Sequence, residues 1–301
     1  MTTGTPFETR PFYRTPAAEA EAHALYDEAR AALPFATEER TIETRLGATH
    51  VLVAGPEGAP DVVMLQGGNV VSPLTLAWLA PLTSRLRIWG PATLGQPGRS
   101  AGVRPVRDAA FGPWLVDVLD GLDLRQPAFV AASQGVGPLL ELVALAPERI
   151  RRAALVVPSG MVATPLRATL LLAAGYFAYR LRPGDGRSRS TLRILTGGRE
   201  PDELMVRATS LSFGGTELET SMPPLATSDR VAGLRAPVLV LAGARDPLFP
   251  AARVLPRARE LFPTLVAAET LPGAHLPGPE DLRLLAAHLG RFLLPDTPAS
   301  P

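Results

Sequence analysis

A general base that works near neutral pH is most often a histidine, and this chain of 301 residues has only four. His23 lies in an N-terminal segment rich in Ala and Glu, His50 lies within an expected strand, and His288 lies on an expected helix. These positions favour structural roles. His275 instead lies in the Gly- and Pro-rich loop 271–279, from which a side chain can project over a sheet. We therefore expect His275 to carry the chemistry.

A serine follows an apolar run and directly precedes a helical pattern. Residues 129–137 read FVAASQGVG, so Ser133 has Ala131 two positions before it and Gly135 two positions after it. The nucleophile elbow G-x-S-x-G needs small residues at these places because its serine sits on a strained strand-to-helix turn. A serine at a strand end otherwise serves mostly as a helix N-cap. With a strand before it and a helix after it, Ser133 is the predicted nucleophile.

A carboxylate follows a late apolar run. Residues 238–250 read VLVLAGARDPLFP, which places Asp246 just after an expected strand. An aspartate before proline is also a common turn residue. Along the chain, however, Ser133 comes first, then Asp246 and then His275. Catalytic triads built around a nucleophile elbow have this same order of serine, acid and histidine. The other position for the acid, 158–160, reads Pro-Ser-Gly and holds no carboxylate, so Asp246 is the predicted third member.

A serine mechanism also needs N–H donors for the negative oxygen of its tetrahedral intermediate. The backbone N–H of Gln134 begins the helix after the nucleophile, where unpaired donors and the helix dipole favour an anion. A second donor is expected from the loop 64–69, MLQGGN, whose glycine pair permits a close backbone approach. We predict Gly68 for this role, with Gly67 and Asn69 as open alternatives.

Composition excludes several other chemistries. The chain has no cysteine, and its basic residues are all arginine, so thiolate metal sites, a cysteine nucleophile and lysine-dependent mechanisms are excluded. Four scattered histidines offer no metal-ligand spacing, so we expect no metal and no cofactor. The formal charge of +1 lacks the electrostatic footprint of a nucleic-acid binder, and we expect a small-molecule substrate instead. Oligomeric state is not readable from the sequence.

The first ten residues, MTTGTPFETR, contain an acid and no apolar run, which argues against a secretory signal. The longest apolar stretch, 170–179, is well below the roughly 20 residues of a membrane span. We therefore expect no membrane span and a cytoplasmic location.

Short apolar runs alternate with segments of helical periodicity, which predicts a three-layer α/β fold with a mostly parallel sheet. The expected strands are 41–46, 50–53, 62–65, 86–89, 128–132, 153–157, 238–242 and 265–271. The first two are expected to form an antiparallel hairpin at the sheet edge. We assign 41–160 and 236–295 to this core, 1–40 to a helical extension, 161–235 to a helical cap insertion, and 296–301 to a disordered tail.

The same residues resemble the α/β-hydrolase superfamily, specifically its cap-bearing bacterial esterase-like members, over about 40–295. The resemblance rests on the glycine pair 67–68, the loop 95–100, the serine elbow, and the motifs GARD at 243–246 and GAH at 273–275. Two positions depart from the usual pattern. Gln66 stands where a histidine is usual, and Pro91 stands where an aspartate is usual.

These features predict a serine hydrolase that cleaves an ester or thioester of a small, largely apolar acyl compound through an acyl-enzyme. Two alternatives stay open. The same triad could serve acyl transfer or a lyase step, because function follows the site and not the fold. The departures Gln66 and Pro91 also leave room for a non-catalytic ligand-binding protein on this scaffold.

Overall fold

The computed structural model describes residues 8–106, 109–220 and 222–294. The strands are β1 Thr9–Pro11, β2 Glu38–Thr44, β3 Gly47–Ala54, β4 Asp61–Leu65, β5 Arg87–Pro91, β6 Val103–Pro105, β7 Ala128–Ala132, β8 Arg152–Val156, β9 Val238–Gly243 and β10 Leu265–Leu271. The helices are α1 Pro16–Ala31, α2 Ser72–Leu76, α3 Phe111–Gly121, α4 Val136–Leu145, α5 Leu166–Leu181, α6 Asp185–Leu195, α7 Glu203–Gly215, α8 Ser228–Val231, α9 Ala251–Leu261 and α10 Pro279–Leu293. Three short 3₁₀ helices add η1 Ala77–Leu82, η2 Ser133–Gly135 and η3 Pro147–Arg149.

Eight strands form one sheet in the order β10-β9-β8-β7-β4-β5-β3-β2. The pairs from β10 to β5 are parallel, whereas β3 pairs antiparallel with both β5 and β2. All eight expected strands are present, and the predicted three-layer α/β architecture with a mostly parallel sheet is confirmed. The carboxyl ends of the parallel strands therefore meet at one edge, where open α/β sheets bind ligands.

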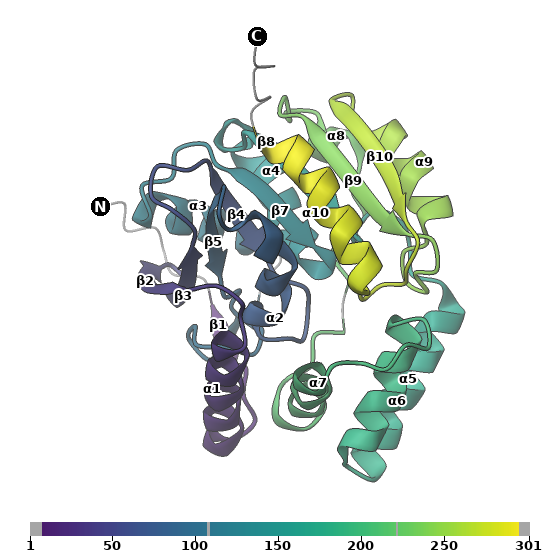
Figure 1. Cartoon of the computed structure of the whole chain (residues 1–301). Helices are drawn as coiled ribbons and strands as arrows, with labels where there is room; N and C mark the ends of the chain where they lie inside the picture. Colours follow the sequence, from purple (N-terminus) through teal and green to yellow (C-terminus); the bar gives the residue numbers. More distant parts are fainter. Residues whose placement is uncertain (1–7, 107–108, 221, 295–301) are drawn as a thin grey trace.

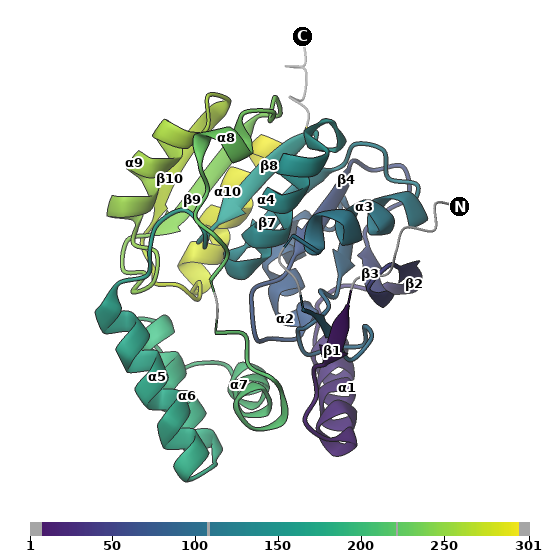
Figure 2. The same ribbon diagram turned by 180° about the vertical axis from the view of Figure 1, so that it is seen from behind.

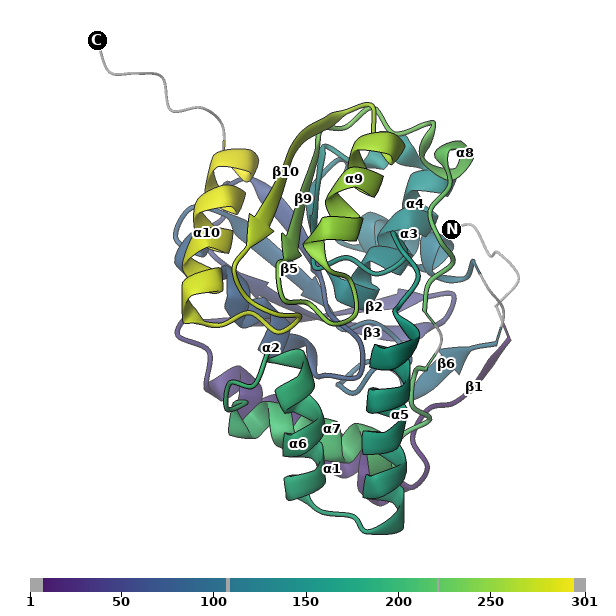
Figure 3. The same cartoon turned by 90° about the vertical axis from the view of Figure 1, so that its right-hand side faces the viewer.

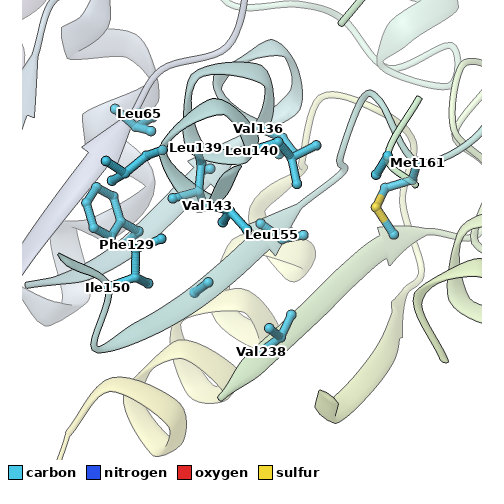
Figure 4. Close-up of a cluster of buried hydrophobic side chains, with 14 of the residues drawn as sticks. Leu65, Phe129, Val136, Leu139, Leu140, Val143, Ile150, Leu155, Met161 and Val238 are labelled. Atoms are coloured by element: carbon cyan, nitrogen blue, oxygen red, sulfur yellow. The ribbon is translucent and has the colours of Figure 1, made fainter. Parts of the chain in front are cut away.

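Two apolar cores lie on opposite faces of this sheet because successive side chains of a strand point to opposite sides. In β7, Phe129 and Ala131 join the core beneath α3, α4 and α9, whereas Ala128, Val130 and Ala132 join the core beneath α2 and α10. Figure 4 shows Phe129 in the first core, together with Leu139, Leu140 and Val143 of α4. Figure 2 shows the helices of that face from the opposite side.

The chain leaves the sheet after β8 and returns to it at β9. Between these strands, α5, α6 and α7 contact one another and stand beyond the carboxyl ends of the strands (Figure 3). We call α5, α6 and α7 the inserted helices. They lie within the range 161–235 that the sequence assigns to a cap.

The N-terminal segment contains more than the expected helix. Helix α1 packs against α7, one of the inserted helices, and also contacts α2 of the core. Strand β1 pairs antiparallel with β6, which the sequence did not indicate because both strands have only three residues. Strand β2 begins at Glu38, within the range 1–40 assigned to the extension. The tail at 296–301 lies outside the described residues.

Within the described residues, no helix is long and apolar enough to cross a membrane.

Candidate active site

Ser133 sits at the sharp turn between β7 and η2, which leads directly into α4. Its φ of +48° lies in the left-handed region, which a residue with a side chain adopts only under constraint. The constraint comes from close packing, since a Cβ at Gly135 would lie 2.6 Å from the carbonyl oxygens of Leu65 and Gln66. Ser159, which follows the neighbouring strand β8, fixes the turn because its hydroxyl donates to the Ser133 carbonyl at 2.8 Å. The turn therefore presents a half-buried Ser133 side chain beyond the strand end.

The structure brings Ser133, His275 and Asp246 together, although they lie on three separate loops. Ser133 Oγ lies 2.9 Å from His275 Nε2, and His275 Nδ1 lies 2.8 Å from Asp246 Oδ2. An ionised carboxylate can only accept hydrogen bonds, so Nδ1 carries the proton that is donated to Asp246. In the neutral ring, Nε2 is then the acceptor for the hydroxyl of Ser133. This is the tautomer that a general base for a serine nucleophile requires.

Asp246 is held by more than its histidine partner. Its side chain has no exposed surface, and its Oδ1 accepts the backbone N–H groups of Leu248 at 2.8 Å and Phe249 at 3.0 Å. Burial alone would raise the pKa of this carboxyl, but the charge and hydrogen bond of His275 and the two N–H groups together lower it. Asp246 is therefore ionised and oriented at neutral pH.

The loop that carries His275 is fixed at its base by Asp281, on the first turn of α10. Asp281 Oδ1 accepts the N–H of Gly273 at 2.7 Å, and its Oδ2 accepts the N–H of Gly278 at 2.8 Å. The loop also contacts the inserted helices, because the N–H of Leu276 donates to the carbonyl of Leu195 at 2.9 Å. The position of the imidazole thus depends on both α10 and α6.

The loop after β4 has three candidate N–H donors, and two of them are occupied. Gly67 N–H donates to Thr75 Oγ1 at 3.4 Å, and Asn69 N–H donates to Gln96 Oε1. The N–H of Gly68 has no acceptor among the described residues. Gln134 occupies the first turn of η2, where backbone N–H groups have no acceptor within the helix. This pattern favours Gly68 and Gln134, the two residues chosen from the sequence, over Gly67 and Asn69.

Gln66, which stands where a histidine is usual, is held by hydrogen bonds from both ends of its side-chain amide. Its side chain is buried; its Nε2 donates to the carbonyl of Val70 at 2.6 Å, and its Oε1 accepts the N–H of Thr93 at 3.1 Å. The glutamine therefore ties the loop after β4 to the segment after β5. Pro91, the other departure, ends β5 and pairs with Val51 of β3.

The sequence did not indicate how several residues that shape this site would be bonded, although Gln66 stood out as a departure from the usual pattern. Ser159 bonds to the carbonyl of Ser133, 26 residues away, and Gln66 bonds to the N–H of Thr93, 27 residues away, so nothing near them in the chain marks those partners. Asp281 alone has a partial signal, because an acidic residue in the first turn of a helix suits the helix dipole. Within the described residues, no group of histidine, aspartate and glutamate side chains could hold a metal ion.

Comparison with known proteins places this geometry in a family. The family described as the alpha/beta hydrolase fold matches residues 62–277, which is most of the chain. The chain therefore belongs to the α/β-hydrolase family and is a hydrolase.

Two curated proteins of Bacillus subtilis (strain 168) are similar in sequence. Carboxylesterase YbfK is 26% identical over 261 residues, which cover 83% of this chain and 86% of the relative. The protein described as uncharacterized carboxylesterase nap is 29% identical over 139 residues, which cover 44% of this chain and 45% of the relative.

Two solved structures from Bacillus subtilis share the fold. The crystal structure of carboxylesterase CesB (YbfK) superimposes with a TM-score of 0.80 at 22% identity and covers 92% of this chain and 98% of its own. The crystal structure of naproxen esterase (carboxylesterase NP) gives a TM-score of 0.80 at 21% identity, with coverage of 93% and 99%.

Proposed function

We propose that this hydrolase is a carboxylesterase that cleaves an ester or thioester of a small, largely apolar acyl compound. The observation that carries the proposal is the continuous path from Ser133 Oγ through the His275 ring to the buried Asp246 carboxylate, with separations of 2.9 and 2.8 Å. The similarity to carboxylesterase YbfK supports the same reaction class.

In this mechanism, Ser133 Oγ attacks the carbonyl carbon while His275 Nε2 takes the hydroxyl proton. Asp246 holds the ring and stabilises the imidazolium that forms. The backbone N–H groups of Gly68 and Gln134 stabilise the oxyanion of the tetrahedral intermediate. The imidazolium then returns its proton to the leaving alcohol or thiol, and water completes the cycle by the same steps on the acyl-enzyme.

A fluorophosphonate probe tests the nucleophile directly. We expect the probe to label the wild-type protein at Ser133 and to leave Ser133→Ala unlabelled, because the probe reacts with an activated serine. Hydrolysis of 4-nitrophenyl acetate and butyrate should fall by about 10⁶-fold or to background, as removal of a catalytic serine does in other triads. Mass spectrometry of the labelled peptide and initial rates provide the two readouts.

Ser190→Ala is the matched control, since Ser190 lies exposed on α6 and donates only to the carbonyl of Gly186. It should retain both labelling and turnover. Labelling of another serine in Ser133→Ala, or undiminished turnover by that variant, would contradict the proposal. Labelling of Ser133 without turnover of oxygen esters or thioesters would instead favour acyl transfer or a lyase step.

A further inference from the structure

A cavity of about 500 Å³ lies beside the loop after β4, a volume within the range of small-molecule sites. Its wall includes Gly68 and Gln134, the proposed oxyanion donors, together with Thr93 and Arg104. The cavity therefore adjoins the place where the reacting carbonyl oxygen would bind. A substrate held at Ser133 has room to extend into it.

Arg104, on β6, is a buried cation that has few partners. Its side chain is only 9% exposed, and its face stacks over the ring of Phe12 at 5.2 Å. Of the five N–H donors of its guanidinium, one is hydrogen-bonded within the described residues, from Nη2 to the carbonyl of Gly95 at 3.1 Å. Among the described residues, Arg104 also forms a long ion pair with Glu219, whose Oε2 lies 3.8 Å from Nη2 and is too far for a hydrogen bond. Burial lowers the pKa of Arg104, which reflects this incomplete compensation of its charge.

Thr93 adds an unpaired hydroxyl to the same wall. The residue is 6% exposed, and its Oγ1 is buried without a hydrogen-bond partner in the described part of the chain. Its backbone N–H is already bonded to Gln66, so the hydroxyl alone is left for a ligand. Buried polar groups in native proteins are nearly always paired, which suggests a partner that binds in the cavity.

The charges around the cavity favour an anion. Among the described residues that line it are three cations and two carboxylates: Arg10, Arg104, Arg230, Glu141 and Glu219. Because both carboxylates repel an anion, and because Arg104 has guanidinium N–H groups without an acceptor in the described part of the chain, the guanidinium is the preferred position for an incoming negative group. Planar guanidinium donors match the two oxygens of a carboxylate.

We propose that this cavity is a carboxylate-binding subsite in which Arg104 and the Thr93 hydroxyl hold a carboxylate that the ester substrate carries away from its scissile bond. The inference rests on the proposed function and specifies the substrate class, namely half-esters of dicarboxylic acids or esters of carboxylate-bearing alcohols. In either class the rest of the molecule can be apolar.

Two pairs of esters separate these classes. The acyl-side pair is the mono-4-nitrophenyl ester of adipic acid and its neutral amide analogue. The alcohol-side pair is 4-acetoxybenzoate and 4-acetoxybenzamide. After subtraction of spontaneous hydrolysis, we expect wild-type kcat/KM to be at least about tenfold higher for the carboxylate in one pair, mainly through a lower KM, since a charged hydrogen bond contributes this much.

Arg104→Met should reduce kcat/KM for that carboxylate ester to the level of its amide while changing the rate with the amide by less than about twofold. Thr93→Val, which keeps the size of the side chain, should raise KM for the carboxylate several-fold and leave kcat unchanged. Arg187→Met, a substitution at an exposed position of α6, is the control and should alter neither pair.

Arg104 also ties β6 to the loop at Gly95, so each variant needs a thermal melt and a fluorophosphonate labelling rate. If Arg104→Met does not fold, Thr93→Val and Arg104→Lys carry the test, with an intermediate loss of the preference expected for the lysine. Absence of a preference for the carboxylate in both pairs, or a preference that persists in Arg104→Met, would overturn the subsite. Neither result touches the proposed esterase activity, which is tested separately by the labelling of Ser133 and by the turnover of the neutral esters in the wild type and in Ser133→Ala.

Discussion

At the scale of single residues, the site depends on how each polar group is held as much as on which groups are present. Asp246 uses one oxygen for His275 and the other for two backbone N–H groups, so its carboxylate cannot rotate without losing bonds on both sides. The imidazole is thereby kept in one tautomer and one orientation. Because the network lowers the pKa of Asp246, the negative charge persists across the neutral range.

Asp246→Asn tests this reading of the carboxylate. The amide has nearly the same shape, but its NH₂ group cannot accept the Nδ1 proton of His275, so the ring is expected to adopt the wrong tautomer. We expect kcat for ester hydrolysis to fall by about 10⁴-fold at neutral pH, the loss seen for this change in another triad. Initial rates and the rate of fluorophosphonate labelling should fall together, while a loss confined to KM would contradict an orienting role.

At the scale of elements, the loop after β4 and the turn after β7 pack closely against each other and leave no space for a larger residue at Gly68. A Cβ at Gly68 would lie 1.6 Å from Gln134 Oε1, so the glutamine side chain occupies the space that any larger residue would need. The same loop is tied to the segment after α7, because the side-chain oxygen of Asn69 accepts the N–H of Glu219 at 3.1 Å. The proposed oxyanion donors are thus positioned by three elements at once.

Gly68→Ala should reduce kcat by about 10- to 1000-fold, because the added methyl group pushes the loop and its N–H away from the reacting oxygen. The obstacle is the side chain of Gln134 and not its backbone. Gln134→Ala should therefore restore much of the activity to the Gly68→Ala protein, which a double-mutant cycle of kcat measures.

Gly186→Ala is the control for this cycle, since a Cβ there meets no atom within 4 Å. A Gly68→Ala enzyme with wild-type kcat, or one that Gln134→Ala does not improve, would contradict the proposed contact.

The sequence predicted the parts of this site that depend on local pattern. Ser133, Asp246 and His275 each follow an apolar strand, and the topology of a parallel sheet brings such positions to one edge. Most supporting contacts were not predictable, because Ser159 and Gln66 bind backbone groups of other segments, whereas the bond from Gly278 to Asp281 is a local cap of α10. No sequence pattern indicated a role for Arg104 either. Its burial depends on the three-residue pairing of β1 with β6, which is too short to produce a periodic pattern in the sequence.

At the scale of the whole molecule, α1 packs against α7 of the inserted helices and is joined to the core through a polar cluster. Tyr26 of α1 is fully buried, and its hydroxyl lies 3.0 Å from His50 Nδ1 of β3. His50 Nε2 lies 2.8 Å from Glu39 Oε2, so a neutral ring donates to the carboxylate and accepts from the tyrosine. Burial lowers the pKa of His50, and hydrogen bonding to Glu39 only partly offsets it.

This cluster makes stability depend on pH in a defined direction. With its pKa lowered in the folded state, His50 binds a proton more readily when unfolded, so the free energy of unfolding should fall as pH drops below about 6.5. The slope from this group is at most about 1.4 kcal/mol per pH unit. His50→Gln should flatten the curve between about pH 6.5 and 5, as measured by urea unfolding at a series of pH values.

His23→Gln, at a half-buried position of α1, is the control and should leave the pH dependence of the free energy of unfolding unchanged. Parallel curves for the wild type and His50→Gln, or a wild-type protein that gains stability on acidification, would contradict this assignment.

The inserted helices leave the sheet at β8 and rejoin it at β9, and these two strands are direct neighbours with Ala153 opposite Val238. Because the two strands are parallel, the chain leaves the sheet at its carboxyl edge, after Val156, and re-enters it at the amino edge, at Val238. A different set of helices could therefore be inserted between the same two strands without changing the order of the strands in the sheet. Any such replacement would have to keep a partner for the N–H of Leu276, which now bonds to Leu195 of α6 and helps to hold the neighbouring His275.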